Sequence, residues 1–162
     1  MTSVDVVIAE DDASMRALLA LAVRRAGFDP IACATGTELL STLEAARERG
    51  RPPALIVSDN RMPGLTGLAV ASTIRSWGWY VPFVLVTAFP DDRLNAEAAE
   101  LQVDEVLGKP VSMQAVTRAI ERLIRTSWRT CPWCGDVVER GECDDCRPTG
   151  TWCADRDIGG SD

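Results

Sequence analysis

The sequence predicts an α/β fold in which a parallel β-sheet is covered by helices on both sides. Five short apolar runs of strand length alternate with five stretches of helical periodicity over residues 4–127. The apolar runs contain few charged residues, as expected of strands that are buried on both faces. The alternation favours a parallel sheet that is covered by helices on both sides and built from right-handed crossover units.

The first strand is expected at residues 4–9, directly before Glu10-Asp11-Asp12. Residues 13–26 have helical spacing, and Gly27 is expected to end that helix. Asp12 is expected to cap its N-terminus. The apolar face of this helix is predicted to consist of Met15, Leu18, Leu19, Ala22 and Val23.

The central strand is Leu55-Ile56-Val57-Ser58-Asp59, which follows Pro52-Pro53 and precedes the turn at Pro63-Gly64. Asp59 therefore lies at the carboxyl end of a buried strand. The other strands and helices are expected, in chain order, at residues 29–33, 36–49, 65–77, 82–86, 90–101, 103–107 and 112–127. Cys33, at the end of a strand, is expected to be a small buried hydrophobic residue.

Composition limits the classes of function. The chain has 162 residues, of which 46% are apolar, enough for one ordinary domain and a small appendage. No apolar stretch approaches the roughly 20 residues that span a bilayer, and the first residues lack the basic start of a signal peptide. We therefore expect a cytoplasmic protein with no membrane partner. The net charge of −7 argues against general binding to nucleic-acid phosphates.

The sequence contains no histidine. This excludes nucleophile triads that depend on histidine, zinc proteases with two histidine ligands, and phosphohistidine carriers. Phosphoryl chemistry in this chain must therefore use a carboxylate, and a zinc site must use cysteine.

Polar side chains follow four of the predicted strands at their carboxyl ends. They are Glu10 and Asp11 after the first, Asp59 after the third, Thr87 after the fourth and Lys109 after the fifth. The carboxyl ends of parallel strands form one edge of a sheet, where ligands bind. Three clustered carboxylates repel one another without a cation, and their hard oxygen atoms suit Mg²⁺.

Asp59 is central in this group and is the natural nucleophile for phosphoryl transfer, with Lys109 supplying positive charge and Thr87 a hydroxyl group. For one aspartate after a strand, a solvated loop carboxylate is the simpler interpretation. Five groups that converge on one edge favour a functional site instead.

With these residues in place, the chain resembles the receiver domain of bacterial two-component response regulators. The resemblance rests on four motifs over about 125 residues: Glu10-Asp11, the Asp59-x-Arg61-Met62-Pro63-Gly64 block, Val86-Thr87-Ala88 and Lys109-Pro110. It implies a flavodoxin-like, doubly wound sheet of five parallel strands in the order 2-1-3-4-5, with residues 1–126 as the receiver domain.

The resemblance also implies the roles of the residues. Asp59 would be the phosphoacceptor, and Glu10 and Asp11 would hold Mg²⁺ together with Asp59 and the main-chain oxygen of Arg61. Thr87 would bind the phosphoryl group and Lys109 would pair with it, with a cis peptide bond before Pro110. The phosphodonor would be a sensor histidine kinase or a phosphotransfer protein. The chain would be no enzyme toward other substrates, because it catalyses only its own phosphoryl transfer and slow dephosphorylation.

Two features depart from the family pattern. Receivers often have Tyr or Phe where this chain has Val106, and a valine cannot make the ring rotation that accompanies the threonine shift. Arg61 and Phe89, two residues beyond Asp59 and Thr87, occupy family positions that influence the access of hydrolytic water. We expect the bulky Phe89 to slow loss of the phosphoryl group.

The aliphatic pattern ends near residue 127. Two Cys-x-x-Cys pairs follow, Cys131 with Cys134 and Cys143 with Cys146, and they resemble a short zinc ribbon. A segment of about 25 residues cannot fold alone, so a structural Zn²⁺ with four thiolate ligands would supply the folding energy. Residues 127–153 are therefore predicted to form a four-cysteine module and residues 154–162 a flexible tail. A rubredoxin-like iron site for redox chemistry and disulfides are the alternatives.

The four-cysteine segment is acidic, which favours an unidentified protein as its target over nucleic acid. A nucleic-acid-binding transcriptional regulator is the competing function, and steep salt dependence of binding would favour it. Arg118, Arg122, Arg125 and Arg129 form a row along the last helix, which is either a solvated face or a contact with an acidic partner or a second copy of the receiver in a homodimer.

Overall fold

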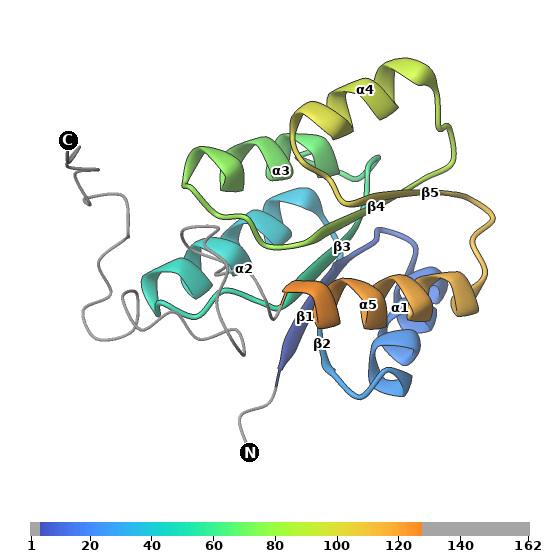
Figure 1. Cartoon of the computed structure of the whole chain (residues 1–162), viewed down its shortest axis with the longest axis horizontal. Coiled ribbons are helices and arrows are strands. Elements are labelled where there is room, and N and C mark those ends of the chain that lie inside the picture. The colour runs from blue at the N-terminus through green and yellow to red at the C-terminus, as the bar shows by residue number, and fades with distance from the viewer. Residues whose placement is uncertain (1–3, 128–162) are drawn as a thin grey trace, which may run out of the picture.

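The computed structural model describes residues 4–127, which form a central sheet between two layers of helices (Figure 1). The elements in chain order are β1 (Asp5–Ala9), α1 (Ala13–Arg25), β2 (Asp29–Cys33), α2 (Gly36–Glu48), β3 (Leu55–Asp59), α3 (Gly67–Ser76), β4 (Phe83–Thr87), α4 (Asp92–Glu100), β5 (Glu105–Gly108) and α5 (Met113–Ser127). Each predicted strand and helix is present, with ends that differ by at most two residues.

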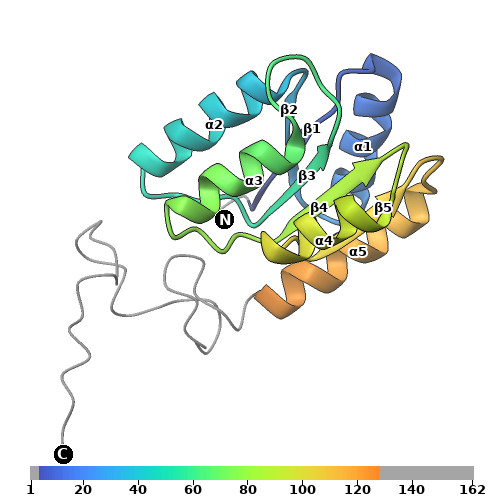
Figure 2. The same ribbon diagram turned by 90° about the horizontal axis from the view of Figure 1, so that it is seen from above.

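The five strands are all parallel and lie in the order β2-β1-β3-β4-β5. This confirms the flavodoxin-like topology. Helices α1 and α5 cover one face of the sheet, and α2, α3 and α4 cover the other (Figures 1 and 2). The carboxyl ends of β1, β3 and β4 are adjacent in register, since Ala9 pairs with Ser58 and Asp59 pairs with Val86.

Each face of the sheet has its own hydrophobic core. Alternate residues of a strand point to opposite faces, so Val6 and Ile8 pack toward α1 and α5, whereas Val7 and Ala9 pack toward α2 and α3. All residues of β3 and β4 are buried, while the edge strands β2 and β5 are partly exposed. The position of Asp59 is therefore fixed by a strand that is packed on both sides.

Side-chain caps define where the helices begin. Asp12 accepts a hydrogen bond from the main-chain nitrogen of Met15 at 2.7 Å, which confirms it as the cap of α1. Thr35, Thr66 and Asp91 cap α2, α3 and α4 in the same way. Gly27 ends the first helical segment with a φ of 91°, a conformation that favours glycine.

The predicted apolar face of α1 is wrong at one position. Leu18 is 46% exposed, and the buried residues of α1 are Leu19, Ala20, Ala22 and Val23. These residues centre the buried face between Leu19 and Val23, where α1 packs against the sheet and α5. At about 100° per residue, Leu18 and Ala20 flank Leu19 on opposite sides, and Leu18 lies farther from the centre of the buried face, which leaves it exposed.

The helix α4 is the least buried of the helices on its face. Ala98 is its one fully buried residue, as expected from its polar sequence. Its C-terminal end is held by Arg75 of α3, whose side chain donates hydrogen bonds to the carbonyl oxygens of Leu101 and Gln102 at 2.9 Å. The same guanidinium also donates to the carbonyl oxygens of Trp79 and Val81. Arg75 thus ties α3, the segment before β4 and the end of α4 together.

Cys33 is 1% exposed, which confirms it as a buried residue, and burial raises the pKa of its thiol. In the predicted arginine row, Arg118, Arg122 and Arg125 are exposed, and Arg122 pairs with Glu105 of β5. No helix within residues 4–127 is long and apolar enough to cross a membrane. The predicted four-cysteine module with Cys131, Cys134, Cys143 and Cys146, the tail 154–162 and Arg129 lie outside the described residues.

Candidate functional site

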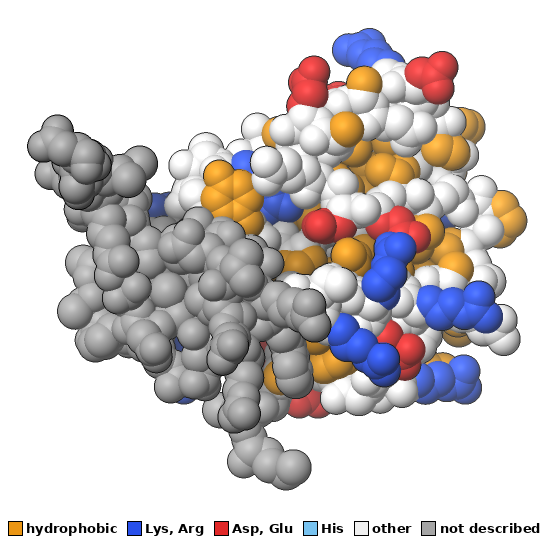
Figure 3. Space-filling model, viewed as in Figure 1, with side chains coloured by type: hydrophobic (Ala, Val, Ile, Leu, Met, Phe, Trp, Pro, Cys, Tyr) orange, Lys and Arg blue, Asp and Glu red, His pale blue; other side chains and the backbone are white. Residues whose placement is uncertain are grey.

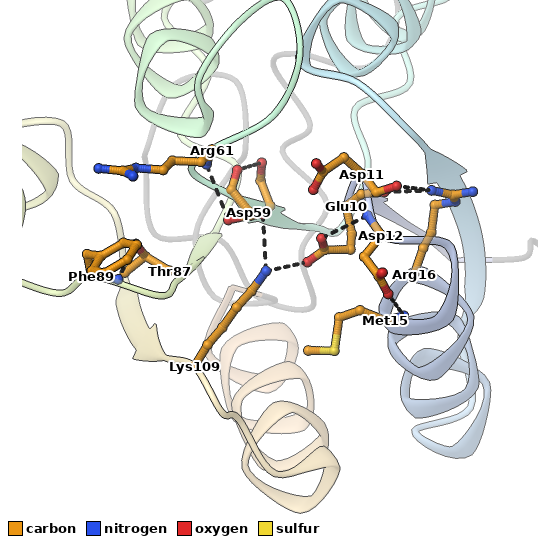
Figure 4. A network of polar contacts seen from close by, with 11 residues as sticks. Glu10, Asp11, Asp12, Met15, Arg16, Asp59, Arg61, Thr87, Phe89 and Lys109 are labelled. Atoms are coloured by element: carbon orange, nitrogen blue, oxygen red, sulfur yellow. Dashed lines mark hydrogen bonds and ion pairs between the residues drawn. The ribbon is translucent and has the colours of Figure 1, made fainter.

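The carboxyl edge of the sheet brings together the side chains that the sequence placed there. Glu10 and Asp11 follow β1, Asp59 ends β3, and Lys109 follows β5 and extends back between the carboxylates of Glu10 and Asp59 (Figure 4). Carboxylate oxygens of Glu10, Asp11 and Asp59 all lie within 4.8 Å of one another. Lys109 is 99 positions from Glu10 and 50 from Asp59 along the chain, and the three meet because the parallel strands end at one edge.

Lys109 bridges the two buried carboxylates. Its Nζ lies 2.9 Å from Glu10 Oε2 and 3.1 Å from Asp59 Oδ2. Glu10 is 0% exposed and Asp59 is 5% exposed, so neither carboxylate is well solvated. Charge-assisted hydrogen bonds to the ammonium group replace the lost water.

Burial dominates the electrostatics of the site. Desolvation raises the pKa of the Glu10 carboxyl, although hydrogen bonds from Lys109 and the Asp12 amide oppose this effect. Partial burial by itself lowers the pKa of Lys109, but its hydrogen bonds with Glu10 and Asp59 outweigh burial and raise that pKa above the ordinary value. Lys109 therefore remains positively charged near neutral pH.

The donor set fits a hard divalent cation. One ammonium group faces three carboxyl groups, so the cluster retains an excess of oxygen ligands and negative charge. Asp11 is exposed, which gives an ion access from solvent. Oxygen ligands without histidine or cysteine are typical of Mg²⁺ sites.

Thr87 ends β4 beside the acidic cluster and is 2% exposed. Its Oγ1 accepts a hydrogen bond from the main-chain nitrogen of Phe89 at 3.2 Å. The carbonyl oxygen of Thr87 accepts a hydrogen bond from the Lys109 amide at 2.7 Å, and the Lys109–Pro110 peptide bond is cis, as the resemblance implied. The two chain segments that carry Thr87 and Lys109 are therefore fixed to each other.

Arg61 and Phe89 stack on each other at one side of the site. The Arg61 guanidinium carbon lies 4.8 Å from the centroid of the Phe89 ring, which is a cation–π contact (Figure 4). The Arg61 amide donates to Asp59 Oδ1 at 3.2 Å, just as the Phe89 amide donates to Thr87 Oγ1. The main chain of Arg61 is therefore linked to the Asp59 side chain, and the main chain of Phe89 is linked to the Thr87 side chain. Phe89 remains 62% exposed.

Val106 is partly buried on β5, opposite Leu85 of β4, and packs against the core beneath α2, α3 and α4. It leaves no aromatic ring at the position where many receivers have one.

Three further residues shape the site, and the sequence patterns did not indicate them. Arg16 of α1 donates to the carbonyl oxygens of Glu10 at 2.8 Å and Asp11 at 3.2 Å, which fixes the acidic turn (Figure 4). Asn60 Oδ1 accepts from the Leu68 amide, so it joins the end of β3 to the start of α3. Gly67 allows α3 to begin against the main chain of Asp59, because a Cβ there would lie 2.6 Å from the Asp59 carbonyl oxygen.

Comparison with known proteins identifies the family. Residues 6–121 match the model of the response regulator receiver domain. The alkaline phosphatase synthesis transcriptional regulatory protein PhoP of Bacillus subtilis is 28% identical over 127 residues, which cover 78% of this chain and 51% of PhoP. The probable transcriptional regulator ycf27 of Porphyridium aerugineum is 32% identical over 120 residues, covering 74% of this chain and 48% of the relative.

Solved structures show the same fold. The receiver domain of the Francisella response regulator 1452 superposes with a TM-score of 0.70 at 21% identity, over 77% of this chain and 99% of that domain. The chemotaxis protein CheY4 of Vibrio cholerae gives a TM-score of 0.66 at 22% identity, over 75% of this chain and 99% of that protein. This chain spans only about half the length of the first two curated relatives.

The parallel five-stranded fold, the acidic cluster at its carboxyl edge and the lysine that faces this cluster are together typical of a receiver domain. The chain belongs to the response regulator receiver family of two-component systems. Receiver domains bind Mg²⁺ at an acidic pocket, which corresponds here to Glu10, Asp11 and Asp59, and they interact with histidine kinases or phosphotransfer proteins.

The close approach at Gly67 gives a testable prediction. In Gly67→Ala, the new Cβ would meet the Asp59 carbonyl oxygen at 2.6 Å and Leu85 Cδ1 at 2.8 Å, so α3 or the end of β3 must shift. We expect the free energy of unfolding to fall by about 1–3 kcal/mol, the usual cost of overpacking. Urea unfolding followed by circular dichroism measures it. Ser72→Ala, on the exposed side of the same helix, is the control and should leave the midpoint nearly unchanged.

Proposed function

We propose that this chain accepts a phosphoryl group on Asp59 and transmits the phosphorylated state to a partner protein. The observation that carries this proposal is the buried Asp59 carboxylate, held by Lys109 within reach of Glu10 and Asp11. A carboxylate in this position is aligned for attack on phosphorus, and the positive charge beside it offsets the charge that develops.

In the proposed step, an Asp59 oxygen attacks the phosphorus of a phosphohistidine on the donor protein. The phosphorus–nitrogen bond breaks, its electron pair returns to the imidazole of the donor, and an acyl phosphate forms on Asp59. A bound Mg²⁺ would neutralise charge on the phosphoryl oxygens, with Glu10, Asp11, Asp59 and the main-chain oxygen of Arg61 as its protein ligands. Lys109 pairs with the new phosphoryl group.

Thr87 has a hydroxyl group suited to the same phosphoryl group. To donate to a phosphoryl oxygen, it turns toward Asp59 and loses the hydrogen bond from the Phe89 amide. The chain acts on no other substrate in this proposal: it catalyses its own phosphorylation and slow dephosphorylation. The donor is a sensor histidine kinase or phosphotransfer protein, because this chain has no histidine.

Acetyl phosphate labelling tests the phosphoacceptor. With Mg²⁺ present, the full chain should form one acyl phosphate and Asp59→Asn should form none, because the amide is not nucleophilic. Intact-mass spectrometry measures the added phosphoryl group. Asp92→Asn, which removes an exposed acid at the start of α4, is the matched control and should be labelled normally. A label that persists on Asp59→Asn would contradict the assignment.

Phe89 is proposed to slow loss of the phosphoryl group, because its ring stacks on the side chain of Arg61, whose amide donates to Asp59. Phe89→Ala should accelerate decay of the acyl phosphate about fivefold, the factor given by about 1 kcal/mol of barrier. Decay is followed after removal of acetyl phosphate. Tyr80→Ala, an exposed aromatic residue at the opposite edge of the sheet, should decay at the rate of the unaltered chain. An unchanged rate in Phe89→Ala refutes this role.

For the segment that follows the receiver, we keep the proposal of a four-cysteine module over residues 127–153, with structural Zn²⁺ on Cys131, Cys134, Cys143 and Cys146. The support is the pair of Cys-x-x-Cys motifs and the small size of the segment. The acidic composition of this segment favours a protein as its target. The surface of the receiver domain is proposed to contact a partner protein as well, or a second copy of the chain in a homodimer. Strong salt dependence of target binding would point to nucleic acid instead.

Metal analysis tests the module. The purified chain should contain one zinc per chain, and Cys131→Ser should lose most of it because three thiolates bind less tightly. Cys153→Ser, which changes a cysteine outside the two Cys-x-x-Cys pairs, is the control and should retain the metal. Inductively coupled plasma mass spectrometry measures the stoichiometry. A visible absorption spectrum typical of an iron–thiolate site would show that the bound metal is iron and not zinc. Protein purified without any metal would contradict the proposed four-cysteine module.

A further inference from the structure

The edge of the sheet opposite Asp59, where the strands begin, contains a pocket of about 210 Å³. Its lining comes from the start of β1, from β2, from α2 and from the segment before β3. The lining residues are Asp5, Val7, Ile31, Thr42, Ala46, Arg49, Arg51 and Pro53. We call this the amino-edge pocket. It shares no residue with the site at the carboxyl edge.

The amino-edge pocket has an apolar floor and a basic rim. Val7, Ala46 and Pro53 are buried, whereas Arg49 and Arg51 are exposed. Asp5 is the one acid in the lining, so the two arginines give the pocket a net positive charge. Such a surface fits an acidic peptide that also carries small apolar side chains.

Outside the pocket lining, an arginine near the end of α2 contacts an aromatic side chain at the end of α3. The Arg47 guanidinium lies 4.8 Å from the centroid of the Trp77 ring. Trp77 is partly exposed, and its ring meets the Trp79 ring edge to face. The helix dipole favours a basic residue in the last turn of a helix, which accounts for Arg47 at the end of α2. Arg51 lies three residues beyond α2, so the helix dipole does not account for it.

The chain itself supplies a peptide of the required chemistry. The helix α5 ends at Ser127 on the side of the molecule where α2 also ends, so the chain leaves the domain at this edge (Figures 1 and 2). Residues 128–162 contain 4 basic and 8 acidic side chains. Five of these acids, Asp136, Glu139, Glu142, Asp144 and Asp145, fall within ten residues that contain one base, Arg140, and the apolar Val137-Val138.

The domain carries no comparable acidic excess, with 13 basic and 16 acidic side chains in residues 1–126. Within residues 4–127, the cluster of Glu10, Asp11 and Asp59 lies at the carboxyl edge of the sheet, and Arg49 and Arg51 lie at the amino edge. On the face of the domain drawn in Figure 3, positive and negative side chains are scattered among each other. An acidic segment tethered at the amino edge is repelled by the acidic cluster and attracted by Arg49 and Arg51. Because the segment is covalently attached, its effective concentration is high and weak ion pairs suffice.

We propose that the amino-edge pocket binds residues 136–145 of this chain's own C-terminal segment. Arg49 and Arg51 pair with carboxylates of that stretch, and the apolar floor receives the side chains of Val137-Val138. The contact holds the cysteine-rich segment on the side of the receiver that faces away from Asp59. It does not depend on phosphoryl transfer, and it stands whether or not Asp59 is the phosphoacceptor.

Hydrogen–deuterium exchange of the full chain tests this contact. All samples contain saturating Zn²⁺, and the readout is amide exchange in residues 136–145. The charge reversal Arg49→Glu with Arg51→Glu should accelerate that exchange roughly two- to thirtyfold, the factor expected from two surface ion pairs. High salt should accelerate exchange in the unaltered chain as well.

Matched variants separate docking from general effects of charge. Arg24→Glu with Arg25→Glu reverses two exposed charges at the end of α1, at the same edge of the sheet but on its other face, and should leave exchange unchanged. Glu139→Arg with Glu142→Arg, added to the Arg49→Glu and Arg51→Glu chain, should restore protection because the charges are exchanged.

Three results would overturn the proposal. Unchanged exchange in the Arg49→Glu, Arg51→Glu chain would show that the pocket does not hold the segment. Equal acceleration in the Arg24→Glu, Arg25→Glu chain would show a nonspecific effect of net charge. Protection that rises with protein concentration would assign the pocket to a second copy of the chain.

Discussion

The two hydrogen bonds of the Lys109 ammonium group, to Glu10 and to Asp59, are the interaction on which the site depends. Two buried carboxylates side by side would repel each other and lack solvation, and the positive charge between them offsets both costs. Lys109 follows β5, Glu10 follows β1, and Asp59 ends β3. The interaction therefore exists only when β1, β3, β4 and β5 have assembled in their final order.

Much of this arrangement could be predicted from the sequence, because apolar periodicity marks strands and strand ends mark the edge of the sheet. Asp59, Glu10 and Lys109 were placed by that reasoning alone, while the strand order came from the family resemblance. The contacts of Arg16, Asn60 and Gly67 could not be predicted, since they depend on the path of the main chain in the turns after β1 and β3. The error at Leu18 has a related cause: the rotation of a helix about its axis depends on its neighbours.

Arg61 and Phe89 show how the sheet creates a contact between two loops. Each follows its site residue by two positions, and β3 and β4 are adjacent, so the two side chains meet above the strand ends. The sequence indicated that both positions lie near the site, but their stacking depends on side-chain direction. With Val106 on β5, the aromatic ring near Thr87 is supplied by the loop after β4 and not by the neighbouring strand.

The uneven burial of the helices has a mechanical consequence. A single fully buried side chain, Ala98, lies near the C-terminal end of α4, and Arg75 donates hydrogen bonds to the carbonyl oxygens just past that end. Displacing the start of this helix exposes Leu94, which is partly buried against the core, while displacing its end breaks charged hydrogen bonds. A rotation about the C-terminal end moves the N-terminal end the most, and that end directly follows the loop that contains Phe89.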